Sequence, residues 1–260
     1  MTPATAASGL TAPLSASETE DIIDRFYRDG CVVVPGVLGA DECAALRVLT
    51  DEIAKSSPSF VIRNPEEQDI AFARLFIREP ILSLVRKILG PECRFCGQNV
   101  IRNLPGQSIS HWHVDDKLEY PLPPDVPRWE ARARLPLTWL SVQVPLSDIL
   151  ASEDGPTEVV PGSHYSGRLS PKENPVFEGR GAEPVLCRAG DIYLFNHQVW
   201  HRGSPNTGKH TRYLMQLQYA RGDSLAWRCQ GAARTPALER VLAGADPKLV
   251  ELMVGPPKYV

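Results

Sequence analysis

Short β-rich runs, divided by Gly, Pro and Asp, fill the second part of the chain. These runs lie at Phe95–Leu104, Ile109–Asp115, Leu137–Leu146, Glu183–Cys187, Asp191–Phe195 and Arg212–Tyr219. Many short strands with turn residues between them are typical of β-sandwiches and barrels. The pattern therefore predicts a mainly β fold of the jelly-roll type.

Helical patterns come before most of the strands. Ser17 and Glu20 have the spacing of a capping box, and they predict the start of a helix that ends at Gly30. Two further helices and one strand are predicted at Asp41–Ala54, Pro80–Leu89 and Cys31–Val34. We expect these helices to pack outside the sheet, which makes the fold mainly β with flanking helices.

The size of the chain, 260 residues of which 43% are hydrophobic, is enough to bury one full core. We expect residues 17–260 to form a single domain, and residues 1–16, which are rich in Ala, Thr, Ser and Pro, to form a flexible tail. The N-terminus lacks the basic start and apolar centre of a secretory signal. The sequence therefore predicts a cytoplasmic location.

The charge of the chain argues for a small-molecule substrate. The net charge is −3 without an obvious block of Lys and Arg, so neither a nucleic acid nor a membrane surface is an expected partner. No apolar run approaches the ~20 residues that span a bilayer. We expect a monomer or a homodimer.

His113-Val114-Asp115 and the later His201 have the composition of a catalytic metal site. Side chains at positions i and i+2 of a strand leave the same face, so His113 and Asp115 can project toward one metal ion. A second imidazole from His201 completes the two-histidine, one-carboxylate set that binds Fe(II) and leaves open positions for reactants. The spacing predicts that these three residues are the catalytic metal ligands.

Four motifs in this order resemble the phytanoyl-CoA dioxygenase family over about residues 20 to 220. They are His113-Val114-Asp115, the Asp154–Thr157 turn with the following Val160–His164, the run Ala189–Phe195, and the pair His201 and Arg212. The resemblance implies a double-stranded β-helix, which is a cupin-like jelly roll, and an enzyme that depends on Fe(II), 2-oxoglutarate and O2. It also implies His113, Asp115 and His201 as iron ligands.

The resemblance assigns Arg212 to the distal carboxylate of 2-oxoglutarate, and the chemistry of arginine suits that role. A guanidinium group matches a carboxylate bidentately and stays charged at any working pH. Many relatives have a Ser or Thr two residues after the distal His, whereas this chain has Gly203 there and Ser204 next. Ser204 and Gln98 are therefore our candidates for assisting Arg212.

The reaction that the resemblance implies is oxidation of an unactivated C–H bond, with release of succinate and CO2. Hydroxylation is the expected outcome, while desaturation, epoxidation and ring formation are reached from the same site. Halogenation is disfavoured, because related halogenases replace the carboxylate ligand that Asp115 retains here. The substrate is expected to be a small organic molecule, and a natural-product scaffold is at least as plausible as an acyl-CoA.

Residues near the iron motif are candidates for touching the substrate. We expect Asp116–Pro136, which is charged and proline-rich, to act as an active-site lid. Its arginines would suit an anionic substrate, although each can equally be a solvated loop charge. The candidate substrate-binding residues are Trp112, Asp116, Lys117 and Tyr120, and Trp112 has packing as its alternative role.

Two other functions remain open at this point. The first is a cupin-like metalloenzyme that does not use 2-oxoglutarate and binds its metal through His111, His113 and His201. His111 shares the strand parity of His113, so it is a possible fourth ligand or a group at the mouth of the site. The second is a non-catalytic jelly-roll binding module.

Overall fold

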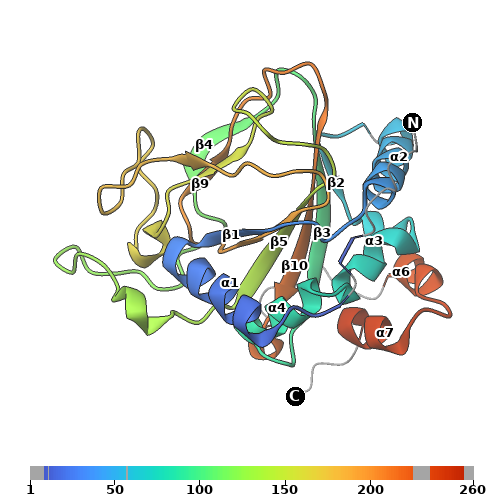
Figure 1. Cartoon of the computed structure of the whole chain (residues 1–260), viewed down its shortest axis with the longest axis horizontal. Coiled ribbons are helices and arrows are strands. Elements are labelled where there is room, and N and C mark those ends of the chain that lie inside the picture. The colour runs from blue at the N-terminus through green and yellow to red at the C-terminus, as the bar shows by residue number, and fades with distance from the viewer. Residues whose placement is uncertain (1–8, 11, 57, 225–234, 255–260) are drawn as a thin grey trace.

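The structure is a computed structural model, and it describes residues 9–10, 12–56, 58–224 and 235–254 (Figure 1). The α-helices are α1 (Ala16–Asp29), α2 (Ala40–Ser56), α3 (Ile70–Arg74), α4 (Ile81–Leu89), α6 (Pro236–Val241) and α7 (Pro247–Val254). The strands are β1 (Cys31–Val34), β2 (Val61–Arg63), β3 (Arg94–Asn103), β4 (Ile109–His113), β5 (Trp139–Pro145), β6 (Thr157–Val159), β7 (Glu183–Pro184), β8 (Ile192–Phe195), β9 (His201–Gly203) and β10 (Arg212–Ala220).

These strands form two antiparallel sheets. The larger sheet has the order β1-β8-β5-β10-β3-β2, and the smaller sheet has the order β4-β9-β6-β7. In Figure 1 the helices α1, α3 and α4 lie on one side of the larger sheet, and β4 and β9 lie on the other side. The predicted mainly β fold with flanking helices is confirmed.

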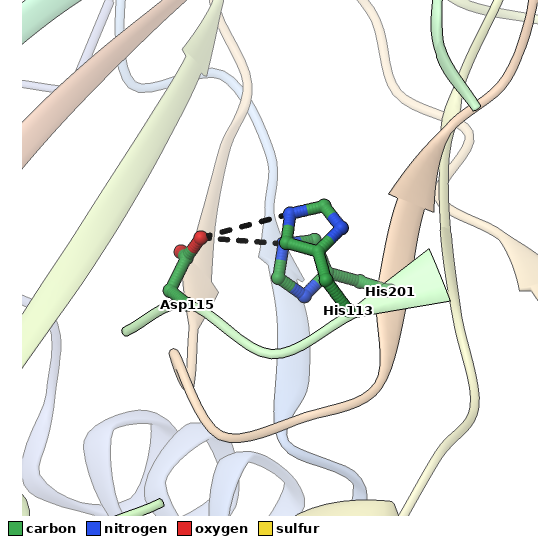
Figure 2. A group of neighbouring side chains, drawn as sticks. All are labelled: His113, Asp115 and His201. Carbon is green, nitrogen blue, oxygen red and sulfur yellow. Dashed lines mark ion pairs between the residues drawn. The ribbon is translucent and has the colours of Figure 1, made fainter. Parts of the chain in front are cut away.

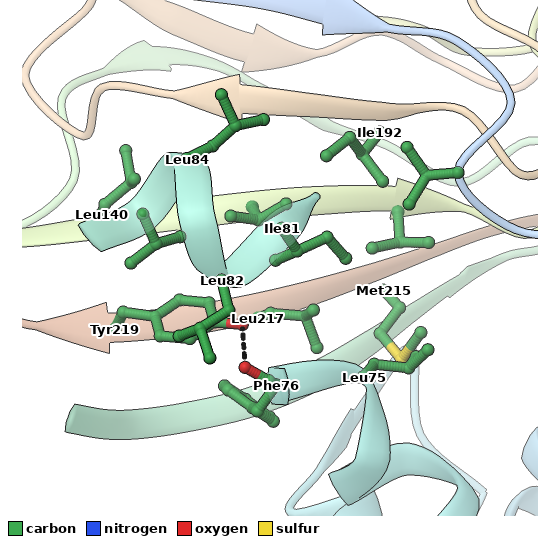
Figure 3. Packing of buried hydrophobic residues seen from close by; sticks show 14 of the residues in the cluster. Leu75, Phe76, Ile81, Leu82, Leu84, Leu140, Ile192, Met215, Leu217 and Tyr219 are labelled. Atoms are coloured by element: carbon green, nitrogen blue, oxygen red, sulfur yellow. Dashed lines mark hydrogen bonds between the residues drawn. The ribbon is translucent and has the colours of Figure 1, made fainter. Parts of the chain in front are cut away.

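The alternation of side chains along β10 separates the core from the cavity. Met215, Leu217 and Tyr219 belong to the main hydrophobic core, which the helices cover. Figure 3 shows Ile81 and Leu82 of α4 over this face, together with the hydrogen bond from the Tyr219 hydroxyl to a main-chain carbonyl of the segment before α4. The intervening residues of β10 point to the opposite face of the sheet, because successive side chains of a strand alternate.

All six β-rich runs contain a strand, and the helices at 41–54 and 80–89 and the strand at 31–34 are also confirmed. The predicted strand Ile109–Asp115 is too long at its C-terminal end, because β4 ends at His113. Three strands were not predicted: β2, β6 and β9 have three residues each, which is too short for an alternation pattern. Within the described residues, no helix combines the length and the apolarity that a bilayer crossing requires.

The start of α1 differs from the prediction. Ser15, not Ser17, is the N-cap: its hydroxyl accepts a hydrogen bond from the Glu18 amide, and the Glu18 carboxylate accepts one from the Ser15 amide. The prediction was wrong because Ser15 and Ser17 are both followed by Glu after three residues, and the helix uses the earlier pair.

The described part of the predicted tail at residues 1–16 makes contacts with the folded chain. Ala16 already lies in α1, and the Leu10 amide donates a hydrogen bond to the Gly36 carbonyl after β1. Residues 1–8 and residue 11 lie outside the described residues. The flexible tail and the single domain therefore stay predictions.

We predict that Ser15→Ala destabilises the protein by about 1 kcal/mol, because it removes the acceptor for an amide at the helix start. Ser17→Ala is the matched control, and we expect a change of less than about 0.5 kcal/mol for this exposed position. Urea unfolding of both variants measures the difference. Equal losses for the two variants would place the cap elsewhere.

Candidate metal centre

The two histidines of the predicted triad lie opposite each other on neighbouring strands. His113, the last residue of β4, pairs with His201, the first residue of β9. Asp115 follows β4 by two residues, and its Oδ1 lies 3.8 Å from Nε2 of His113 and 3.6 Å from Nε2 of His201 (Figure 2). One ligand atom from each residue lies within 4.8 Å of the others. This spacing suits a single metal ion.

The tautomers of both rings are set by the main chain. Nδ1 of His113 lies 2.9 Å from the carbonyl of His111, and Nδ1 of His201 lies 2.9 Å from the carbonyl of Val199. A proton on Nδ1 satisfies each carbonyl and leaves the lone pair of Nε2 directed at the carboxylate. Both rings are thus held ready to bind a metal through Nε2.

The protonation states also favour a divalent cation. Burial, together with the charge of His201, lowers the pKa of His113. Burial tends to raise the pKa of Asp115, but the neighbouring histidines, His201 first among them, outweigh this effect and lower it overall. An ionised carboxylate beside an imidazole whose protonation is disfavoured is suited to binding a metal.

A turn, rather than a regular strand, brings Asp115 into the site. The Asp115 amide donates a hydrogen bond of 2.8 Å to the His197 carbonyl. The side chain of Gln198 bonds to the same turn three times: Oε1 accepts from the Glu119 amide at 3.0 Å, and Nε2 donates to the carbonyls of Lys117 at 3.2 Å and Asp115 at 3.4 Å. The loop before β9 therefore fixes the ligand after β4.

A contact between two buried ionisable side chains also links this turn to the loop before β9. Nε2 of His197, a fully buried residue, lies 3.0 Å from Oε1 of Glu119. The ring of His197 stacks on Trp139 at 4.5 Å between centroids, and the hydroxyl of Thr138 donates to the Glu119 carboxylate. Sequence reasoning did not find this pair, because its members belong to different loops.

The triad opens onto a cavity of about 270 Å³, which Arg212 also lines. Arg212 begins β10 and is only 4% exposed. Its Nη1 donates to the Gly155 carbonyl, whereas its Nε has no hydrogen-bond partner among the described residues. A buried guanidinium with a free donor and no carboxylate partner in the described part of the chain is suited to an anionic ligand.

The two candidates for assisting Arg212 do not line this cavity. Gln98 lies on the opposite face of β3, where its amide donates to the Phe72 carbonyl at 3.2 Å and contacts Sδ of Met215. These contacts give no support to Gln98 as the assisting group, because Asn99 and Ile101, on the other face of β3, are the residues of this stretch that line the cavity. Ser204 is buried, and its hydroxyl has no partner among the described residues.

None of the four candidate substrate residues lines the cavity either. Trp112 packs beside the cluster of Val114, Val160 and Trp200, and Cζ of Arg202 lies 5.0 Å from the centroid of its ring. Asp116 and Lys117 are exposed, and the Tyr120 hydroxyl donates to the Pro136 carbonyl at 2.9 Å. These contacts agree with the packing alternative for Trp112.

The middle of the segment 116–136 is hydrogen-bonded to the side chain of one arginine. The guanidinium of Arg168 donates to the carbonyls of Pro123, Pro124, Val126 and Pro127 at 2.6–3.3 Å. No residue of the segment lines the cavity. Its arginines pair with carboxylates: Arg128 with Glu178, Arg132 with Glu130, and Arg134 with Asp24. The lid prediction therefore gains no support from these contacts.

His111 lies beside the triad and outside its ligand set. Its ring centroid is 4.7 Å from that of His113, and the side chain is exposed. Among the described residues, the group that can hold a metal consists of His113, Asp115 and His201. This favours the histidine and carboxylate set over the three-histidine set of the cupin-like alternative.

Comparisons with known proteins agree with this geometry. Residues 26–214 match the family model described as phytanoyl-CoA dioxygenase. Multifunctional dioxygenase prhA of Penicillium brasilianum is 24% identical over 75% of this chain and 69% of its own length. Two solved structures share the fold. HygX from Streptomyces hygroscopicus, with nickel and 2-oxoglutarate bound, has a TM-score of 0.64 and 21% sequence identity, and the match covers 80% of this chain and 88% of HygX. EctD from S. alaskensis, with 2-oxoglutarate and 5-hydroxyectoine, has a TM-score of 0.63 and 22% identity, and the match covers 84% of this chain and 81% of EctD.

We predict that His113→Ala weakens binding of Co(II), a spectroscopic substitute for Fe(II), by more than about 100-fold, because losing an outer partner of a ligand alone costs 10–100-fold. His111→Ala is the matched control and should bind Co(II) like the wild type. Visible absorption titrations measure both, with circular dichroism as the check on folding. An equal loss in His111→Ala would restore the three-histidine set.

Proposed function

The chain belongs to the phytanoyl-CoA dioxygenase family of Fe(II)- and 2-oxoglutarate-dependent oxygenases, and we propose that it hydroxylates an unactivated C–H bond of a small organic substrate, with release of succinate and CO2. One observation carries this proposal: the triad of His113, Asp115 and His201 and the unpaired guanidinium of Arg212 line the same cavity. The cytoplasmic location and the oligomeric state stay predictions.

His113, Asp115 and His201 would hold Fe(II) through two imidazole nitrogens and one carboxylate oxygen. Three protein ligands on one face leave the remaining positions for the cosubstrate and O2. Because Asp115 is anchored through its main chain to the loop before β9, its carboxylate is oriented before any metal arrives. Such preorganisation lowers the cost of binding the ion.

Arg212 would bind the distal carboxylate of 2-oxoglutarate. Its unsatisfied Nε and its burial support a charged ligand of this kind, since an unpaired buried donor is costly. Thr157 also lines the cavity, and it follows Gly155, whose carbonyl already holds the guanidinium. We therefore propose the Thr157 hydroxyl, which lies 2.9 Å from the Tyr193 hydroxyl, as the assisting group in place of Gln98 and Ser204.

Iron and 2-oxoglutarate would supply the oxidising power, with one oxygen atom of O2 passing to succinate and the other to the substrate. The protein's own part is to position the reactants and to exclude water. Phe195 packs edge-on against His201, with 4.7 Å between centroids, and Trp139 lines the cavity while covering His197. These aromatic walls keep the metal ligands partly out of solvent.

Hydroxylation is supported by a relative of the same fold, since EctD was crystallised with the hydroxylated compound 5-hydroxyectoine. A natural-product substrate is supported by HygX, which was also crystallised with hygromycin B bound. We extend both ideas to this chain and propose a small polar metabolite of natural-product type.

The central test is anaerobic addition of Fe(II) and then 2-oxoglutarate to metal-free protein. We predict a weak visible charge-transfer band from chelated cosubstrate, followed by slow succinate formation when O2 is admitted. His201→Ala should give neither signal. Iron binding without the band would overturn the use of 2-oxoglutarate.

We predict that Arg212→Ala raises the 2-oxoglutarate concentration for half-maximal band intensity by about tenfold to 100-fold, because each charge-assisted hydrogen bond contributes about 1.5–3 kcal/mol. Arg212→Lys should recover part of this loss, since lysine keeps the positive charge but cannot form a bidentate pair with a carboxylate. Fe(II) affinity measured without cosubstrate is the control and should not change. Wild-type cosubstrate affinity in Arg212→Ala would move the anchor to another residue.

A further inference from the structure

A row of polar side chains crosses the cavity face of the larger sheet. Arg63 of β2 pairs with Asn99 of β3, Asn99 pairs with Gln216 of β10, and Gln216 pairs with Gln143 of β5. All four residues line the cavity. Residues that are directly paired on adjacent strands put their side chains on the same face, so the row is continuous from the sheet edge to its middle.

An apolar row runs beside the polar one. Val61, Ile101 and Leu214 are likewise paired across β2, β3 and β10, two residues along each strand, and they also line the cavity. The wall opposite the metal strands therefore offers hydrogen-bonding groups in one stripe and a hydrophobic stripe next to it. A small scaffold with one apolar and one polar side would match both.

Arg63 differs from the other arginines near the site in having no partner. Within the described residues it makes no hydrogen bond and no ion pair, whereas Arg202, which also lines the cavity, is 2.5 Å from a carboxylate oxygen of Glu158. The arginines of the segment 116–136 are all paired with carboxylates. Arg63 thus leaves an uncompensated positive charge at the edge of the cavity.

The position of Arg63 separates it from the cosubstrate anchor. Arg212 lies on β10 four residues before Gln216, which belongs to the row of Arg63, so the backbone positions of the two arginines are offset by about 13 Å along the strand direction. They also differ in exposure, because Arg212 is buried and Arg63 is exposed. One cavity therefore contains two arginines without a carboxylate partner among the described residues.

We propose that Arg63, with Asn99 and Gln216, forms an oxyanion subsite that binds a carboxylate or phosphate group of the substrate. The remaining amide of the row, Gln143, would bind a further polar group of the same molecule, and a cavity of about 270 Å³ suits a small metabolite. The substrate class is a small carboxylic acid or phosphate ester that carries a further polar group. This inference rests on the proposed function, because it assumes that the same cavity holds the iron and the cosubstrate.

Calorimetric titration of three probes with one shared ring tests the subsite. The protein is loaded anaerobically with Fe(II) and saturating 2-oxoglutarate, and the charge-transfer band verifies that the cosubstrate is chelated, which under the proposed function places its distal carboxylate at Arg212. Cyclohexanecarboxylate, cyclohexyl phosphate and the neutral cyclohexanecarboxamide are then titrated separately. We expect at least one anionic probe to bind about tenfold more tightly than the amide, and the stronger of the two identifies the group that the subsite prefers.

Three variants test whether Arg63 causes the preference for the anionic probe. Arg63→Gln should remove the preference for the anion, Arg63→Lys should keep part of it, and Arg25→Gln on the outer helix α1, with the same change of charge, should leave it intact. No preference in the wild type, or a preference that persists in Arg63→Gln, would overturn the subsite. A missing charge-transfer band would instead count against the proposed function, so the two failures are distinguishable.

Discussion

The two-residue period of the larger sheet is the constraint on which both the core and the cavity depend. On β10, Met215, Leu217 and Tyr219 are buried against the helices, so Arg212, Leu214, Gln216 and Gln218 must face the other way. A slip of one residue would bury the polar set under the helices and expose the core set. The hydrophobic free energy of the core therefore also holds the cavity lining in register, and Arg212, the proposed cosubstrate anchor, is positioned by packing on the opposite face.

Long-range main-chain contacts do the same for the metal ligands. His113 and His201 are opposed because β4 pairs with β9, and Asp115 is held by the loop that leads into β9. The three hydrogen bonds from Gln198 tie the turn after β4 to that loop, and the buried contact between His197 and Glu119 fixes its far end. These contacts restrain the positions of the proposed ligands, although Nδ1 of His197 and Oε2 of Glu119 have no hydrogen-bond partner among the described residues. A substitution of Gln198 is therefore expected to alter the position of Asp115.

The sequence predicted the triad better than its surroundings, for a physical reason. A histidine and a carboxylate two positions apart are a local signal, and their ligand chemistry is specific. The sequence could not choose between two adjacent polar residues of β3, Gln98 and Asn99, because only the pairing with β10 decides which of them faces the cavity. Arg63 was missed because β2 is a three-residue edge strand without a periodic pattern. Likewise, two equal capping boxes overlap at the start of α1, and local spacing cannot choose between them.

The different burial of the two cavity arginines has a consequence for the order of binding. The buried Arg212 has lost its hydration and has only the Gly155 carbonyl as a partner, so the protein gains most when an anion completes its hydrogen bonds. The exposed Arg63 keeps its water and costs little when no ligand is present. An anionic substrate that entered first would be drawn to the more demanding Arg212, whereas prior binding of 2-oxoglutarate leaves Arg63 as the remaining uncompensated guanidinium among the described cavity residues. Under the proposed function, cosubstrate binding before substrate would therefore sort the two anions to their own ends of the cavity by electrostatics.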